Sequence, residues 1–262
     1  MRIAVISPFA DHNGKTTVSM LLGMQLSKSA RKVCMCHTKP ISDSVFQYLA
    51  LNNFTDKTST PSQIVKILKE GDVSADSVSD YCKNVTDQFE VFTNNHTNFS
   101  RDDMQYMLNY IVQSFPHEHV VIDIDNLDME YNKKIIAMCD VVVLVVTQDI
   151  AEAKNFRDSK EEFTKLVNDK PLIVIVNKYN STKGTLAELA RWMGIKKPNN
   201  WLVLHENPWI TWGTNHGKIE QVFRMAHRKD TRVIELGTEL SKIGVMLMKA
   251  KTLTNKKKGG RR

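Results

Sequence analysis

The sequence contains few of the residues that mark specialised structural classes. Among its 262 residues are 4 cysteines, 7 prolines and 11 glycines. So few cysteines exclude a small disulfide-stapled fold, and so little proline and glycine excludes a collagen-like or low-complexity chain. No run of about eighteen apolar residues occurs, so no membrane-spanning helix is predicted. The first apolar segment reaches Ser7-Pro8 too soon to be the core of a signal peptide, and we expect a cytoplasmic protein.

The cysteines are scattered and lie mostly in or beside apolar runs. We expect them to be reduced and structural, as small apolar side chains usually are inside a protein. Cys34 and Cys36 are separated by one residue, which is the wrong spacing for a zinc knuckle. Alternation along a strand would place both side chains on the same face.

The charge is distributed unevenly. The chain has 36 basic and 29 acidic residues, but the segment from Lys249 onward is basic and holds no acid. We predict a domain over residues 1–248 and a disordered basic tail over 249–262. Such a tail is either simply solvated or attracts anionic partners such as nucleic acid or lipid headgroups.

Short apolar runs alternate with stretches of helical spacing, which is typical of parallel strands joined by crossover helices. The runs are apolar throughout, as expected of strands covered on both faces. We therefore predict a single α/β domain with a mostly parallel central sheet flanked by helices. Helices are expected at 16–26, at 101–115, over 219–251 and, more weakly, at 62–70. The predicted strands are 2–6, 32–36, 119–124, 141–147, 171–176 and 201–205.

A phosphate-binding motif follows the first predicted strand. Gly14-Lys15-Thr16 supplies the second half of G-x-x-x-x-G-K-[ST], with Phe9 in place of the first glycine. In this context the helix N-terminus and the lysine bind phosphates, and the hydroxyl holds Mg²⁺. A plain strand-to-helix turn is the alternative. The candidate nucleotide-binding residues here are Asn13, Gly14, Lys15, Thr16 and Thr17.

Polar residues also lie at the ends of two later predicted strands. Asp123 and Asp125 lie where open α/β sheets bind ligands, so Asp123 could hold Mg²⁺ and Asp125 could position water. The alternative is that both are solvated acids capping the next turn. Asn177 has an amide suited to the edge of adenine, or it could cap the following helix.

These motifs together resemble the ParA/MinD group of P-loop ATPases, whose loop reads K-G-G-x-G-K-T-T. Segments 119–123 and 172–178 resemble the family's Walker B strand and the strand whose Asn, here Asn177 before Lys178, reads adenine. Pro208 falls in the family's loop beside the base, and the match covers roughly residues 1–248. The resemblance implies ATP and Mg²⁺ as cofactors, with Thr16 and Asp123 at the metal. It also implies a homodimer that positions or partitions DNA, or a secretion or conjugation apparatus, with an unidentified protein cargo.

Two departures from the family affect the expected chemistry. Ala10 replaces the lysine that reaches the partner's nucleotide, and Asp11 puts a carboxylate where the loop should close on phosphate. The acids of the family's D-x-D-P-Q switch align with His37 and Lys39. We therefore expect a weak ATPase at most, the alternative being a non-hydrolysing scaffold that acts through protein contacts. A tyrosine-kinase relative is disfavoured because no tyrosine follows Tyr179.

Lys39 offers a possible compensation for the missing lysine. Its ammonium could approach the γ-phosphate and act in catalysis with Asp123 and Asp125, and His37 could serve as a second donor. The alternative is that Lys39 is simply solvated.

The C-terminal part combines an apolar stripe, predicted to be core, with basic residues. No Trp or Phe occurs in the last thirty residues, so we expect non-specific DNA rather than a membrane as the anionic partner. Trp209 and Trp212 are expected in a loop, as packing or a dimer contact. The candidate anion-binding residues are Arg224, Arg228, Lys229, Arg232, Lys256, Lys257 and Lys258.

Overall fold

The computed structural model has a central sheet of parallel strands. It describes residues 1–9, 13–29, 32–39, 43–51, 65–66, 69–71, 81–93, 100–125, 129–167, 170–195 and 201–259. The strand order is β3-β4-β2-β5-β1-β6-β7-β8, and only the β3–β4 pair is antiparallel. The bounds are β1 (Arg2–Ile6), β2 (Val33–His37), β3 (Lys83–Thr86), β4 (Phe89–Val91), β5 (His119–Asp123), β6 (Val141–Val146), β7 (Leu172–Tyr179) and β8 (Trp201–His205).

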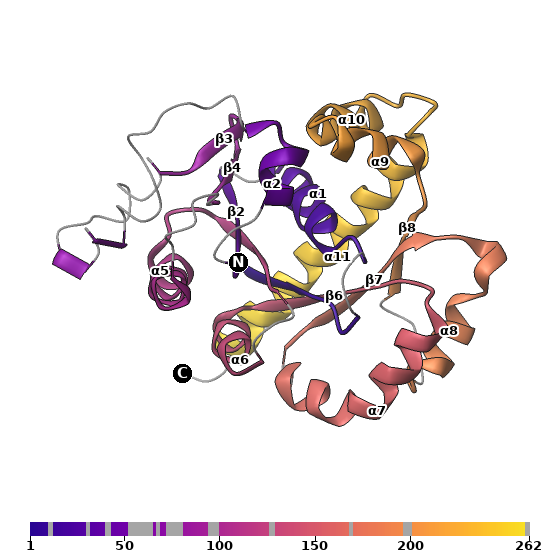
Figure 1. Cartoon of the computed structure of the whole chain (residues 1–262), viewed down its shortest axis with the longest axis horizontal. Helices are drawn as coiled ribbons and strands as arrows, with labels where there is room; N and C mark the ends of the chain where they lie inside the picture. The colour runs from indigo at the N-terminus through magenta and orange to yellow at the C-terminus, as the bar shows by residue number, and fades with distance from the viewer. Residues whose placement is uncertain are drawn as a thin grey trace.

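Helices cover both faces of this sheet (Figure 1). One face packs against α1 (Lys15–Ser27), α2 (Asp43–Tyr48), α9 (Pro208–Asn215), α10 (Ile219–His227) and α11 (Ile234–Gly259). The other packs against α5 (Arg101–Ser114), α6 (Met129–Met138), α7 (Ile150–Val167) and α8 (Leu186–Trp192). This is the predicted single α/β domain with a mostly parallel sheet, and the fold-class prediction is confirmed.

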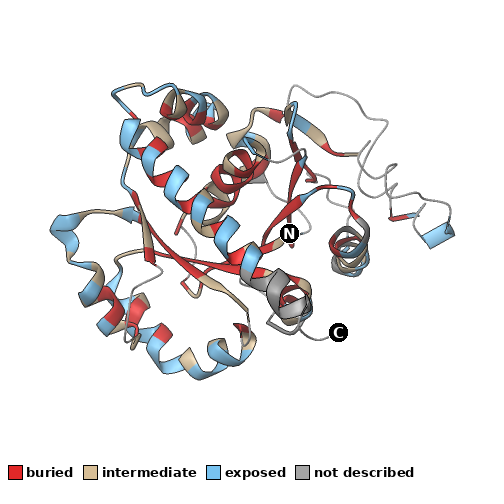
Figure 2. Ribbon diagram, turned by 180° about the vertical axis from the view of Figure 1, so that it is seen from behind, coloured by how far each residue is buried: buried red, intermediate tan, exposed pale blue. Residues whose placement is uncertain are grey.

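The apolar character of the strands follows from this double cover. Every residue of β6 is buried, and in β1 Ile3 faces one core while Ala4 faces the other. Figure 2 shows the buried sheet between helices whose outer faces are exposed. A strand with two buried faces has no polar alternation, so its ends are hard to place from sequence. Accordingly, β7 continues three residues beyond the predicted end at Val176.

The structure adds elements that the sequence did not predict. The β3–β4 hairpin lies in the polar region between residues 50 and 100, where only helix was expected. Its strands are short and β3 is only partly buried, so neither shows a clear apolar run. The weak helix predicted at 62–70 lies mostly outside the described residues. Within the described ranges, no helix is both long and apolar enough to cross a membrane.

The C-terminal region differs from the prediction in three places. The single helical stretch 219–251 is two helices, because the chain turns between Arg228 and Val233. Helix α11 runs through the expected domain boundary at 248 to Gly259, so residues 249–259 form helix in the structure, where a disordered tail was expected. Lysine is a good helix former and no glycine interrupts the segment earlier. Trp209 and Trp212 lie in α9 and not in a loop, and both pack against the core as expected.

Candidate phosphate-binding site

The predicted loop connects β1 to α1 at the carboxyl edge of the sheet. Gly14 takes the N-cap position of α1 with φ 77°, a left-handed conformation that favours glycine. The Asn13 amide donates to the Phe9 carbonyl at 3.3 Å, and its oxygen accepts from the Lys15 backbone N–H at 2.9 Å. The side chain of Asn13 therefore closes the loop on itself and directs Lys15 into the first turn, in which Thr17 lies half-buried.

Phe9, which stands in place of the family's first glycine, is part of the hydrophobic core. Its side chain is 2% exposed and packs in the cluster beneath α5–α8. The substitution therefore adds buried apolar area at the start of the loop. Ala10, Asp11 and His12 lie outside the described residues, so the predicted effect of Asp11 on phosphate stays a prediction.

Asn177 secures the loop from the neighbouring strand. Its buried amide donates to the Asn13 carbonyl at 2.8 Å. A Cβ on Gly14 would lie 2.3 Å from the Asn177 Nδ2, so a glycine is required where the two elements meet. The next helical turn is capped by Asn180 and not by Asn177, so the helix-cap interpretation of Asn177 is wrong. Its predicted reading of adenine stays a prediction, as does that of the adjoining Lys178, which is exposed with φ 52°.

Thr16 and Asp123 form the centre of the site. The Thr16 hydroxyl donates to the Asp123 carboxylate at 2.6 Å, while the other carboxylate oxygen is buried without a hydrogen-bond partner among the described residues. Burial raises the pKa of Asp123, although the Lys15 ammonium and the Thr16 hydrogen bond oppose the shift. The Lys15 ammonium donates to the Ile124 carbonyl beside them. A hydroxyl and an uncommitted carboxylate oxygen are hard donors of the kind that Mg²⁺ prefers.

Hydrogen bonds to two side chains hold the backbone of Asp125. Its N–H donates to the Thr38 hydroxyl at 2.8 Å, and its carbonyl accepts from the Asn132 amide at 2.8 Å. Asp123 and Asp125 are each 6% exposed, so their interpretation as solvated acids is wrong. Sequence reasoning missed the supporting roles of Thr38 and Asn132. Thr38 directly follows β2 and reaches Asp125 only through the pairing of β2 with β5, for which the sequence carries no signal.

The structure separates the roles proposed for His37 and Lys39. Lys39 is exposed, yet its charge is close enough to oppose the burial-driven rise in the pKa of Asp123 and to add to the burial-driven fall in the pKa of His37. His37 is buried, with Nδ1 2.6 Å from the Lys39 carbonyl oxygen and Nε2 2.7 Å from the Thr93 hydroxyl. Both ring nitrogens are thus engaged within the protein, and the expectation that His37 donates to phosphate is wrong.

The burial of His37 predicts a loss of stability in mild acid. Burial lowers its pKa to about 4, so the unfolded chain takes up a proton below pH 6.5 while the folded chain does so only near pH 4. Acidification through this window should lower the free energy of unfolding by about 3 kcal/mol through His37 alone. The buried His119, whose pKa is also lowered to about 4 mainly by burial, adds in the same direction. The raised pKa of Asp123 acts in the opposite sense, because the stability that a raised carboxyl pKa contributes is present at low pH and is lost as pH rises.

Urea unfolding between pH 7 and pH 4.5 measures this dependence. His37→Gln should flatten it, whereas replacement of the exposed His216 should not. A denaturation midpoint that stays constant across the window would contradict the prediction.

The remaining predicted site residues lie farther along the chain. Pro208 opens α9 directly after β8, and Asn207 caps that helix by accepting from the Trp209 N–H at 2.9 Å. In the predicted basic cluster, Arg224 pairs with Glu220 at 2.7 Å and Arg232 pairs with Asp230 at 2.6 Å. These carboxylates offset two of its charges, so the cluster is less basic than expected. Arg228 and Lys229 are exposed, and the side chains of Lys256, Lys257 and Lys258 lie outside the described residues.

Comparison with known proteins finds the same fold in solved structures of ATPases. No family model and no curated protein sequence matches the chain. Solved structures do match it over nearly their full length. The septum site-determining protein MinD of Pyrococcus horikoshii, complexed with Mg-ADP, is similar with a TM-score of 0.69 at 13% identity, covering 97% of this chain and 98% of that one.

Two further structures extend the likeness to the ParA branch. A ParA family ATPase from Chlorobium tepidum matches with a TM-score of 0.68 at 9% identity, covering 93% of this chain and 98% of its own. A plasmid partition protein from Borrelia burgdorferi bound to AMPPNP matches with a TM-score of 0.61 at 17% identity, covering 90% and 98%. The chain therefore has the fold of the MinD and ParA family ATPases at low sequence identity, as its motifs indicated.

Proposed function

We propose that this protein binds ATP with Mg²⁺ at the Gly14–Thr16 loop and acts as a nucleotide-dependent positioning or partition factor. The observation that carries the proposal is the contact of Thr16 with the buried Asp123, beside Lys15 and at the N-terminus of α1. This arrangement places a cation and hard oxygen donors where a helix end favours anions. The bound Mg-ADP and AMPPNP of the structurally similar proteins support the same assignment.

The residues present divide the work among themselves. Lys15 and the backbone N–H groups at the start of α1 would hold the phosphates, and Thr16 and Asp123 would hold Mg²⁺. When bound, the metal supplies positive charge at the phosphate oxygens. Asn177 keeps the loop in register with β7. In the resembled family the residues that correspond to Asn177, Lys178 and Pro208 lie beside the base, so we infer that this side of the site receives the base.

We infer that hydrolysis is weak. Lys39 and the fully engaged His37 occupy the switch positions where the resembled family has acids. Asp125 is the remaining carboxylate able to position water, and its backbone is fixed by Thr38 and Asn132. A non-hydrolysing scaffold that retains the bound nucleotide is therefore the second candidate.

Thermal unfolding with nucleotide tests the binding proposal. Mg-ATP at about one hundred times its Kd should stabilise the fold by roughly 2.7 kcal/mol. Adenosine, which lacks phosphates, should stabilise it far less, and a chelator should weaken the effect of ATP. The absence of a shift at millimolar Mg-ATP would refute nucleotide binding and leave a role through protein contacts alone.

Lys39 provides a sharper test within the site. If its ammonium screens the γ-phosphate, Lys39→Ala should raise the Kd for ATP by up to about 5-fold, as expected for an exposed ion pair of 0.2–1 kcal/mol. The Kd for ADP, which has no γ-phosphate, should change less. Calorimetry with both nucleotides measures the difference, and an equal Kd for the variant and the natural protein with ATP would remove Lys39 from the site.

We further propose a homodimer that binds DNA non-specifically through α10 and the basic end of α11. Because Arg224 and Arg232 are locally paired, the attraction should come mainly from Arg228, Lys229 and the lysines at 256–258. Replacing the three terminal lysines with alanine should reduce the salt dependence of DNA affinity by about 2 to 3 in log–log slope. Three exposed basic residues on α7, on the other face, provide a matched control: Lys154, Arg157 and Lys165. An unchanged slope would argue against this surface.

A further inference from the structure

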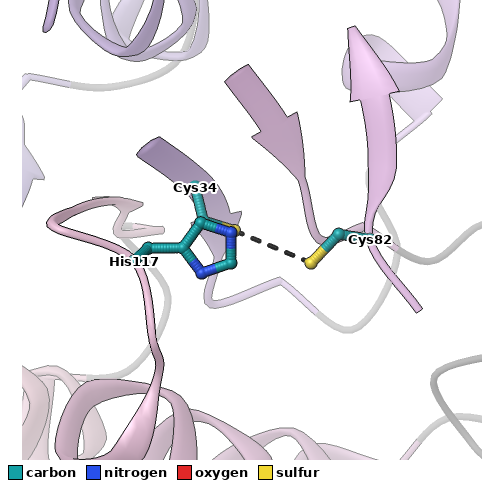
Figure 3. A group of neighbouring side chains, drawn as sticks. All are labelled: Cys34, Cys82 and His117. Carbon is teal, nitrogen blue, oxygen red and sulfur yellow. Dashed lines mark hydrogen bonds between the residues drawn. The ribbon is translucent and has the colours of Figure 1, made fainter. Parts of the chain in front are cut away.

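Two cysteines and a histidine from distant parts of the sequence lie close together near the β3–β4 edge of the sheet. Cys34 lies in β2, Cys82 directly precedes β3, and His117 lies in the loop between α5 and β5. Their potential ligand atoms all lie within 4.8 Å of one another. All three residues are buried, at 0%, 8% and 2% exposure. Figure 3 shows the imidazole beside the two sulfur atoms.

The sulfur separation fits a shared metal ion. The Cys34 and Cys82 sulfurs are 4.0 Å apart, and neither cysteine is in a disulfide. A disulfide would require about 2.05 Å. Two zinc–sulfur bonds of about 2.3 Å at a tetrahedral angle place the sulfurs about 3.8 Å apart, so little movement would be needed.

A carboxylate also meets the histidine. Glu90 Oε2 lies 2.6 Å from His117 Nε2, and Glu90 Oε1 pairs with Lys32 at 2.9 Å. His117 Nδ1 is buried without a hydrogen-bond partner among the described residues. A metal-binding imidazole is usually accompanied by such a carboxylate, which orients the ring and raises its basicity. Glu90 stands opposite Cys34 in the β2–β4 register, so the sheet itself fixes the group.

The backbone around the cluster is also fixed. The Arg2 guanidinium donates to the carbonyls of His117 at 3.1 Å and Phe115 at 3.0 Å. The Phe115 ring stacks on the imidazole with 4.4 Å between centroids. These contacts hold the loop that presents His117 before any ion arrives, which is what a specific metal site requires.

We propose that Cys34, Cys82 and His117, supported by Glu90, bind a zinc ion that fastens the β3–β4 hairpin to the main sheet. Two thiolates, a neutral imidazole and a divalent ion form a set without net charge, which suits a buried site. Thiolate and imidazole donors favour zinc over Mg²⁺. On binding, two S–H bonds break, two zinc–sulfur bonds form and two protons pass to solvent. The site is separate from the Thr16–Asp123 centre, because Cys34 is near the start of β2 and the nucleotide site lies at its end.

Cobalt spectroscopy on the full-length protein tests the proposal. The reduced, chelator-treated chain should bind one equivalent of Co²⁺ with a thiolate-to-cobalt charge-transfer band, and Zn²⁺ should displace it. Cobalt at the oxygen ligands of the nucleotide site would give no such band. Cys34→Ser should abolish the band, while Cys36→Ala, an equally buried cysteine on the same strand, should retain it. Glu90→Gln should lower zinc affinity by about 10- to 100-fold.

A second measurement needs no variant and so does not depend on folding of the substituted chains. Zinc should protect Cys34 and Cys82, but not Cys36 and Cys139, from alkylation under partly unfolding conditions, as read by peptide mass. It should release two protons per ion. Absence of the charge-transfer band together with equal labelling of all four cysteines would overturn the proposal in favour of packed thiols.

Discussion

Replacing Lys15 with alanine is expected to raise the Kd for Mg-ATP by about 10- to 150-fold. This range corresponds to the loss of a hydrogen bond to a charged partner worth about 1.5–3 kcal/mol. Lys15 is positioned at the first residue of α1, and its ammonium lies against the Ile124 carbonyl, next to the Thr16–Asp123 contact. At this point a compact ammonium would meet the oxygens of a phosphate bound at the N-terminus of α1.

The control for this experiment is another lysine with the same kind of bond. The Lys170 ammonium also donates to main-chain carbonyls, those of Ala137 at 2.8 Å and Cys139 at 2.6 Å, but it precedes β7 at the other end of the sheet. Lys170→Ala should therefore leave the Kd unchanged. Calorimetry of both variants, with circular dichroism to confirm folding, gives the comparison. Equal affinities for Lys15→Ala and the natural protein would exclude the loop as the phosphate site.

The turn from Asn13 into α1 could be predicted from sequence because its geometry is local. A buried strand, a glycine and a helix within fifteen residues fix the direction of the Lys15 side chain without reference to the rest of the chain. The six core strands were predictable for a similar reason, since each is a continuous apolar run between polar breaks. The location of Asp123 at the carboxyl edge of the sheet could be predicted because it ends such a run.

The supporting residues could not be predicted because they depend on which strands are neighbours. Thr38 reaches the Asp125 N–H only because β2 pairs with β5, so that His37 lies opposite Asp123. Cys34, Cys82 and His117 meet only because the sheet order brings β4 beside β2. Sequence spacing contains neither relation, and the short separation of Cys34 from Cys36 gives no indication that Cys34 lies beside Cys82.

The C-terminal segment shows a different limit of prediction from sequence. Basic residues without acids suggest an unfolded tail, because like charges repel. In α11 the same lysines continue a helix whose earlier turns are anchored in the core by Leu240, Ile243 and Leu247. A helix that is already nucleated adds residues at little cost, so tertiary packing upstream decided the structure of the charged segment.

Gly14→Ala is expected to destabilise the fold by about 2 to 5 kcal/mol and to impair nucleotide binding. An alanine at φ 77° is strained by about 1–2 kcal/mol. Its Cβ would lie 2.3 Å from the Asn177 amide, which must then move and release the buried Asn13 carbonyl, at a further cost of about 1–3 kcal/mol. Urea unfolding and ATP calorimetry measure the two effects.

A matched glycine separates the strain from the collision. Gly71 has φ 87°, and no described residue lies within 4 Å of its added Cβ, so Gly71→Ala should show the backbone strain alone. The excess loss in Gly14→Ala then reports the contact with Asn177. Combining Gly14→Ala with Asn177→Ala should cost less than the sum of the single changes, because the shortened side chain removes the collision. Strict additivity would mean that Asn177 does not hold the loop, and the link between β7 and the phosphate site would be lost.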